Sequence, residues 1–166
     1  MRRSYELLRR VTNPTGDPSR TDDEIRQLER ARDILFHFCS DAFHLRDWII
    51  SSISDEFVET AVRKLFRDKD NPTNASTALA ASADIANGFK HRELDHPSYT
   101  PGGNATVLSH TQGIRLPAKL PASFSTNHWT ISAAGDMFDV VELADQAVAA
   151  WDKWLKSYNL LPHTHP

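Results

Sequence analysis

The chain has 166 residues, of which 40% are hydrophobic and 25% are charged, and its formal net charge at pH 7 is -3. These values predict one soluble globular domain over residues 1–166. The negative charge argues against a broad electrostatic surface for nucleic acid, and no run approaches the roughly 18 apolar residues of a membrane span. With one cysteine and no apolar signal core after the basic start, we expect a cytoplasmic protein that has no internal disulfide and no contact with a membrane.

The N-terminal half of the chain predicts a series of helices. Residues 1–20 are expected to form a short helix and a loop, because a cluster of proline, glycine and asparagine follows Thr12. The capping box in residues 21–24 then begins a long helix that reaches about Ile53.

Two further helices are expected before the first proline-rich stretch. One opens at residues 54–56 and continues to about Phe66. Its predicted inward face comprises Phe57, Ala61 and Leu65. The alanine-rich stretch 74–94 predicts another long helix. Ala75, Leu79, Ala83 and Ala86 share one face of it, where the alanines would let a neighbouring helix approach closely.

The pattern then changes to an irregular, partly β insertion over residues 95–138, which contains four of the nine prolines. Short β-like runs occur at 105–108 and 128–132, and 134–136 is a tight-turn signal. Asp139 is expected to cap a last helix that continues to about Tyr158. The fold class predicted is mainly α: a bundle of about four to five helices with a small β-hairpin before the C-terminal helix.

Two of the helices carry a polar stripe beside an apolar one. On the long helix, the residues at spacing i, i+4, i+7 and i+11 are His37, Asp41, His44 and Trp48. On the alanine-rich helix, the residues at spacing i, i+3 and i+7 are Asp84, Asn87 and His91. If the two helices pack side by side, the stripes can face each other.

Four interpretations of these stripes remain open. They can brace the bundle through hydrogen bonds, or form a surface for a partner. They can hold a metal through His37, His44, His91 and either Asp41 or Asp84. They can perform acid–base chemistry on His91, or on His44 with Asp47 or Asp41 as its orienting carboxylate. The favoured interpretations need neither a metal nor a cofactor.

Several apolar positions carry expectations of their own. Phe43 lies outside the main apolar stripe of the long helix, which favours a homodimer. Cys39 is expected to be a buried and inert thiol. Trp129, Trp151 and Trp154 fall on apolar patterns and are expected in the core rather than on a surface that stacks nucleobases.

The residues 44–48 (HLRDW) and 84–91 (DIANGFKH) carry a family resemblance. Residues 20–94, together with the last helix, resemble the HEPN-like helical-bundle superfamily of bacteria and phages. The resemblance implies a relation to ribonucleases of toxin–antitoxin and phage-defence systems, whose active site forms across a dimer without a metal. Their motif is an arginine followed by a polar residue and, a few positions later, a histidine.

Applied to this chain, the resemblance implies that Asn87 and His91 occupy the polar and histidine positions of the motif, while Ala86 stands where the arginine is expected. His91 is then the acid or base, Asn87 orients a phosphate and Lys90 supplies charge. A second match to the motif, from Arg32 to His37, lies on the long helix.

The alanine in place of the motif arginine favours a non-catalytic HEPN-like interaction module, or one that binds a nucleotide or RNA. One alternative is a metal-independent endoribonuclease of the toxin or phage-defence type, and another is a metal-dependent hydrolase. Whether the protein is an enzyme stays open at this stage. The partners expected are a second copy of the chain, an RNA or another protein.

Overall fold

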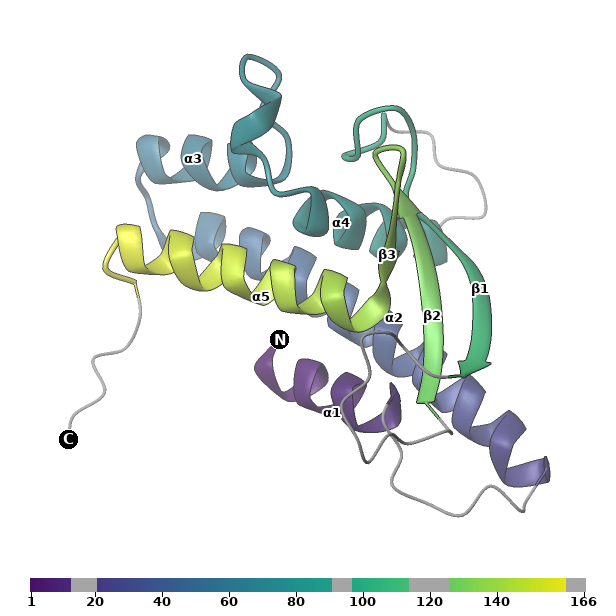
Figure 1. Ribbon diagram of the computed structural model, residues 1–166. Helices are drawn as coiled ribbons and strands as arrows, with labels where there is room; N and C mark the ends of the chain where they lie inside the picture. The colour runs from purple at the N-terminus through teal and green to yellow at the C-terminus, as the bar shows by residue number, and fades with distance from the viewer. Residues whose placement is uncertain (13–20, 91–96, 114–125, 161–166) are drawn as a thin grey trace.

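The computed structural model describes residues 1–12, 21–90, 97–113 and 126–160. Within these residues the fold comprises five α-helices and one three-stranded antiparallel sheet, which lies at one end of the helical bundle (Figure 1). The predicted fold class, mainly α with a small β element before the last helix, is therefore confirmed. The expected hairpin is part of a sheet with one additional strand.

The secondary structure follows the predicted order. The helices are α1 (Arg2–Thr12), α2 (Thr21–Ser52), α3 (Glu56–Phe66), the short 3-10 helix η1 (Pro72–Asn74), α4 (Thr77–Lys90) and α5 (Val140–Ser157). The strands are β1 (Thr106–Gly113), β2 (Thr126–Ala133) and β3 (Asp136–Asp139). Within the described part of the chain, no helix is both long enough and apolar enough to cross a lipid bilayer.

The helix α4 is the centre of the molecule. Every residue from 78 to 86 is buried, and α4 packs against α2, α3, α5 and β1. Most of these residues are alanines, whose small side chains let the neighbouring elements approach the helix from several sides. Leu79, Ala83 and Ala86 of the predicted face are buried as expected, while Ala75 precedes the helix. The residues between them are buried as well, because α4 is enclosed on all sides and has no solvent face over residues 78–86.

The inward face of α3 differs from the prediction by one residue. Asp55 caps the helix and accepts hydrogen bonds from the backbone amides of Phe57 and Val58. Val62 and Phe66 are fully buried, whereas the side chain of Phe57 is 72% exposed. The prediction was wrong because α3 has two adjacent apolar stripes and the second one faces the core. Successive residues lie about 100° apart around a helix, so the two stripes differ in direction by that angle.

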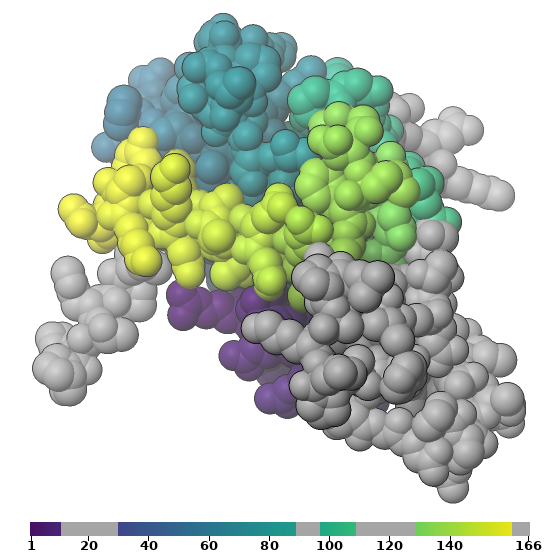
Figure 2. Space-filling model, viewed as in Figure 1, coloured from purple at the N-terminus to yellow at the C-terminus, as the bar shows by residue number. Residues whose placement is uncertain are grey.

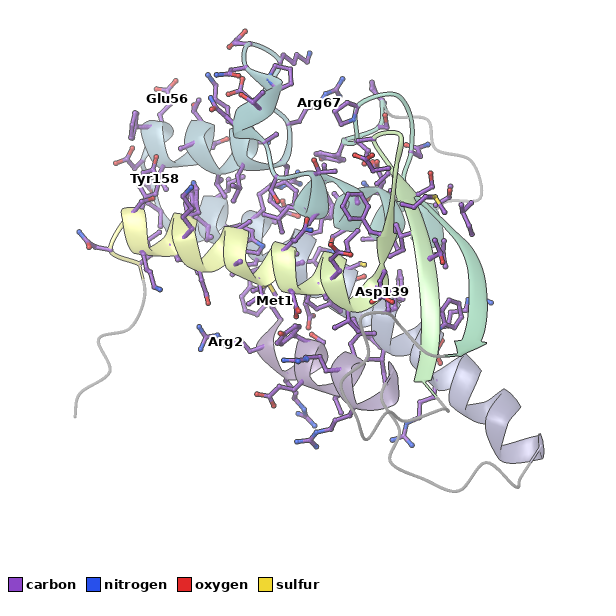
Figure 3. All side chains as sticks on the ribbon, viewed as in Figure 1. Met1, Arg2, Glu56, Arg67, Asp139 and Tyr158 are labelled. Carbon is purple, nitrogen blue, oxygen red and sulfur yellow. The ribbon has the colours of Figure 1, made fainter. Side chains whose placement is uncertain are left out.

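The helices α1 and α5 close the bundle around α2 and α4. Trp151 and Trp154 of α5 are buried, as predicted, and so are Val140, Leu143 and Ala147 of the same helix. The indole N–H of Trp151 donates a hydrogen bond to the backbone carbonyl of Ala42 in α2, at 3.0 Å. Arg2, at the start of α1, forms an ion pair with Asp152 of α5 (Figure 3).

The sheet has the strand order β1-β2-β3, with both pairs antiparallel. Asp139, the last residue of β3, also caps α5 through a hydrogen bond from the amide of Val141, so that the sheet leads directly into the helix. Ala134 and Gly135 connect β2 to β3 with φ angles of 55° and 84°. Two consecutive positive φ angles are typical of a two-residue type I′ hairpin turn, in which asparagine followed by glycine is the preferred pair.

Replacing Ala134 with asparagine is therefore expected to stabilise the protein. An alanine side chain is strained at a left-handed φ, which asparagine tolerates better, so the expected gain is about 0.5–1 kcal/mol. Thermal unfolding of Ala134→Asn beside the parent protein measures it. The companion variant Gly135→Ala places a side chain at φ 84° and should lower the melting temperature. An unchanged or lowered melting temperature for Ala134→Asn would contradict this interpretation of the turn.

Candidate functional site

A cavity of about 730 Å³ lies between α2, α4 and the sheet. It is lined by Arg32 and Leu35 of α2, by Asp84, Ile85 and Gly88 of α4, by residues 104–107 at the start of β1, and by Trp129 of β2. We call it the Arg32 cavity. It collects residues from both halves of the chain because α4 runs back along α2 toward the sheet (Figure 1).

The lining of the Arg32 cavity combines a cation, an aromatic ring and amide groups. Arg32 is exposed, and Trp129 is half-buried. Asn104 is exposed at the entrance to β1. A Cβ atom placed on Gly88 would meet nothing within 4 Å, so the wall formed by α4 is open at that point. A guanidinium group suits a phosphate or carboxylate, and an indole ring offers a flat apolar surface for stacking.

Asp84 holds one wall of the cavity in place. Its carboxylate accepts hydrogen bonds from three backbone amides, those of Tyr99 at 2.7 Å, Thr100 at 3.0 Å and Ala105 at 3.2 Å. The residue is 3% exposed, so these bonds form away from bulk water. Asp84 therefore positions the segment that leads into β1 against α4. Its carboxylate binds this segment and not the polar stripe of α2.

A second contact holds the same segment from its other side. The guanidinium of Arg46 donates to the hydroxyl of Tyr99 at 2.7 Å. It also lies over the rings of Phe43 at 4.1 Å, Phe66 at 5.6 Å and Tyr99 at 5.6 Å from their centroids. Such cation–π contacts are strongest where water is excluded. Arg46 and Asp84 together fix the backbone and the side chain of Tyr99.

The predicted residues at the end of α4 lie next to the Arg32 cavity in the chain. Asn87 is half-buried and directly precedes the cavity residue Gly88. Lys90 is the last residue of α4, but its side chain falls outside the described part of the structure. His91 lies outside the described residues altogether. The roles expected of Asn87, Lys90 and His91 therefore stay predictions.

The predicted pair of His44 and Asp47 lies on α2. His44 is half-buried, with its ring 6.2 Å from that of Phe43. Asp47 is exposed, and one of its carboxylate oxygens accepts hydrogen bonds from two nitrogens of Arg46, at 2.9 and 2.7 Å. Asp47 therefore helps to orient Arg46, and its role as the orienting partner of His44 stays a prediction.

The polar stripe of α2 also reaches α1. The carboxylate of Asp41 accepts a hydrogen bond from the hydroxyl of Ser4 at 2.5 Å and pairs with the amine of Met1 at 3.1 Å. Partial burial raises the pKa of Asp41, but these two contacts outweigh it, with a smaller contribution from His37, so that the pKa is lowered overall. Asp41 thus braces α2 against α1 through Ser4 and Met1.

The second motif match is divided between two faces of α2. Arg32 and His37 are five residues apart, a rotation of about 140° around a helix. Arg32 lines the cavity beside α4, whereas His37 is exposed near Asp41. Arg32 therefore shares a cavity with Asp84, Ile85 and Gly88 of α4, on a different face of α2 from its own histidine.

Trp129 is the cavity residue that the sequence analysis assigned differently. It was expected in the core, and it packs against the core while remaining partly exposed at the cavity. No local signal marks it as a cavity residue, since it reaches the cavity through the pairing of β2 with β1. Asn104 lies two residues before β1 and was not predicted as a cavity residue.

Two other expectations concern buried residues of α2. Cys39 is fully buried, as predicted, and burial raises the pKa of its thiol to about 12 despite a hydrogen bond with Ser82, which disfavours the reactive thiolate. Phe43 is 7% exposed and contacts Phe66 and Tyr99. The argument for a homodimer from an outward Phe43 was therefore wrong, because the segment before β1 covers that ring.

Among the described residues, no cluster of three histidine, cysteine or acidic side chains is arranged to hold a metal ion.

Comparisons of the chain with protein-family models, with curated proteins and with solved structures gave no match. The resemblance to HEPN-like proteins accordingly stays an expectation from the residues quoted from the sequence.

Proposed function

We propose that this protein is a non-catalytic module of HEPN-like type that binds a nucleotide, free or as part of single-stranded RNA, in the Arg32 cavity. The observation that carries the proposal is the meeting of Arg32 and Trp129 in one cavity of about 730 Å³. A volume of this size falls within the range that accommodates a small organic ligand. The position of Asn87 beside Gly88 adds a neutral amide near the same rim.

The chemistry of the two residues fits the two parts of a nucleotide. The indole ring of Trp129 can stack on a base, an interaction of about 1–3 kcal/mol per base that tolerates any sequence. The guanidinium of Arg32 can bind a phosphate through two parallel hydrogen bonds. The net charge of -3 favours a short contact with few phosphates over a long electrostatic track along nucleic acid.

The cavity proposal predicts weaker RNA binding in two variants, one at Trp129 and one at Arg32. Trp129→Ala should weaken binding of a short fluorescent single-stranded RNA at least about tenfold, through loss of stacking. Arg32→Gln should weaken it several-fold and reduce its dependence on salt. Fluorescence anisotropy measures both, and calorimetry with adenosine monophosphate shows whether a free nucleotide is sufficient.

The controls are Trp48→Ala and Arg63→Gln, which remove an exposed tryptophan and an exposed arginine that do not line the cavity. Both should bind RNA as the parent protein does. Wild-type affinity in a folded Trp129→Ala variant would exclude the stacking site. If the parent protein binds neither RNA nor nucleotide, the cavity is not a nucleotide site and a protein partner becomes the better hypothesis.

The same RNA distinguishes the ribonuclease alternative, because cleavage is visible on a gel. Cleavage that resists a chelator and is lost in His91→Ala would favour a metal-independent endoribonuclease over the binding module. In that enzyme Arg32 would supply the arginine that is absent at position 86. Cleavage that the chelator abolishes would favour a metal-dependent hydrolase. Binding without cleavage supports the module.

A further inference from the structure

A second cavity, of about 320 Å³, lies at the opposite end of α4. Its walls are the end of α3 with the segment that follows it, the first turn of α4, and the loop of residues 98–102. In Figure 2 the segment after α3 and the loop before β1 form two neighbouring lobes at the top of the molecule. We call this second site the Arg67 cavity, and its described lining includes none of the candidate site residues named from the sequence.

Two cations line the Arg67 cavity. Arg67 and Lys69 directly follow α3, and both are exposed. Figure 3 shows Arg67 between α3 and the loop that precedes β1. Within the described residues, neither side chain forms an ion pair or a hydrogen bond, in contrast to Arg63 one turn earlier, which pairs with Glu59. Their charge is therefore available to an anion.

A buried hydroxyl group adds an independent sign of a ligand. Thr100 lines the cavity and is 1% exposed, yet its side-chain oxygen has no hydrogen-bond partner in the described structure. Both backbone groups of Thr100 form hydrogen bonds. The amide donates to the carboxylate of Asp84, and the carbonyl accepts from the hydroxyl of Ser98 and the amide of Gly103. A buried hydroxyl without a hydrogen-bond partner is unfavourable. The backbone hydrogen bonds of Thr100 therefore hold the loop in a conformation that leaves this hydroxyl unpaired.

The rest of the lining is compatible with an anion. Thr77 belongs to the first turn of α4, where backbone amides point out of the helix and favour negative charge. Among the described residues that line the cavity, Asp68 is the one acid. Its carboxylate accepts hydrogen bonds from the backbone amides of Asp70 and Asn71 and from the side-chain amide of Asn74. The amide of Asn71 contributes most to lowering the pKa of Asp68, so this charge is already solvated by its own loop.

We propose that the Arg67 cavity binds the phosphate group of a small phosphorylated molecule. Arg67 and Lys69 supply the charge, the hydroxyl of Thr100 donates a hydrogen bond, and the first turn of α4 faces the anion. The cavity is larger than a phosphate ion, and Phe66, Pro72 and Tyr99 form an apolar wall for the remainder of the ligand. The site is separate from the Arg32 cavity, and its test does not depend on RNA binding.

Calorimetry with glycerol 3-phosphate and with inorganic phosphate, at constant ionic strength, tests the proposal. Glycerol 3-phosphate should bind, and stronger binding than that of inorganic phosphate would show that the ester body also makes contact. Arg67→Gln should weaken binding about tenfold. Thr100→Val keeps the shape of the side chain and removes the hydroxyl, so it should weaken binding about five- to tenfold while raising the melting temperature of the free protein.

Thr100→Val is expected to weaken binding and to raise the melting temperature. A general loss of structure would lower both, so the two measurements together distinguish a lost ligand contact from misfolding. Arg63→Gln is the matched control and should bind glycerol 3-phosphate like the parent protein. Equal weakening in Arg63→Gln and Arg67→Gln would show a diffuse surface effect and overturn the proposal. So would unchanged binding in Thr100→Val, or a parent protein that binds neither glycerol 3-phosphate nor inorganic phosphate.

Discussion

Replacing Asp84 with alanine is expected to lower the free energy of unfolding by about 3–5 kcal/mol. The carboxylate accepts hydrogen bonds from three backbone amides, of which those of Thr100 and Ala105 are buried and that of Tyr99 is partly buried, and its removal leaves all three without a partner. No water reaches them readily, because Asp84, Thr100 and Ala105 are each at most 5% exposed. Chemical denaturation measures the loss, and hydrogen exchange should show the amides of residues 99, 100 and 105 exchanging faster than in the parent protein.

Asp84→Asn provides the matched control for this prediction. The amide side chain keeps one oxygen acceptor but brings an N–H group toward backbone donors, so we expect an intermediate loss of stability. Asp84→Ala should also weaken RNA binding in the Arg32 cavity, because residues 104–107 form part of its wall. A loss below about 1 kcal/mol in Asp84→Ala would show that the segment before β1 is held mainly by other contacts.

Replacing Trp151 with alanine is expected to lower the free energy of unfolding by about 3–5 kcal/mol. Trp151 is fully buried and contacts Phe66 and Trp154 edge to face, at 5.7 and 5.8 Å between ring centroids. Removing the ring leaves a cavity between α5, α3 and α2 that the surrounding helices cannot fill without moving. Denaturant unfolding followed by circular dichroism measures the change.

Two further variants separate packing from hydrogen bonding at this position. Trp151→Phe retains much of the apolar volume but loses the hydrogen bond to the carbonyl of Ala42, so its expected loss is about 1–2 kcal/mol. Trp48→Ala removes a tryptophan that is 72% exposed, and we expect a change within about 0.5 kcal/mol. Equal losses in Trp151→Ala and Trp48→Ala would contradict the central position of Trp151.

The helix boundaries were predictable because the signals that set them are local. The helix α3 begins after Asp55 and α5 after Asp139, and each of these carboxylates accepts backbone amides of its own helix. The turn at Ala134 and Gly135 is equally local. Capping and turn formation depend on residues only a few positions apart, so a single sequence contains the information that they need.

The residues that build the cavities were not predictable in the same way. Asp84 was interpreted as part of a polar stripe, but its partners lie 15 to 21 positions later in the chain. Arg32 and Trp129 line one cavity only because strand pairing brings β2 to the end of α4. A helical period shows which residues share a face, but it does not show which distant segment covers that face.

The burial of α4 has a consequence for how the chain can fold. Elements on both sides of it in the sequence enclose this helix: α2 and α3 come before it, and β1 and α5 come after it. A fragment that ends with α4 would leave much of its alanine-rich surface in water, without the contacts that stabilise a short helix. We therefore expect the described elements to unfold together as one cooperative unit rather than as two independently stable halves.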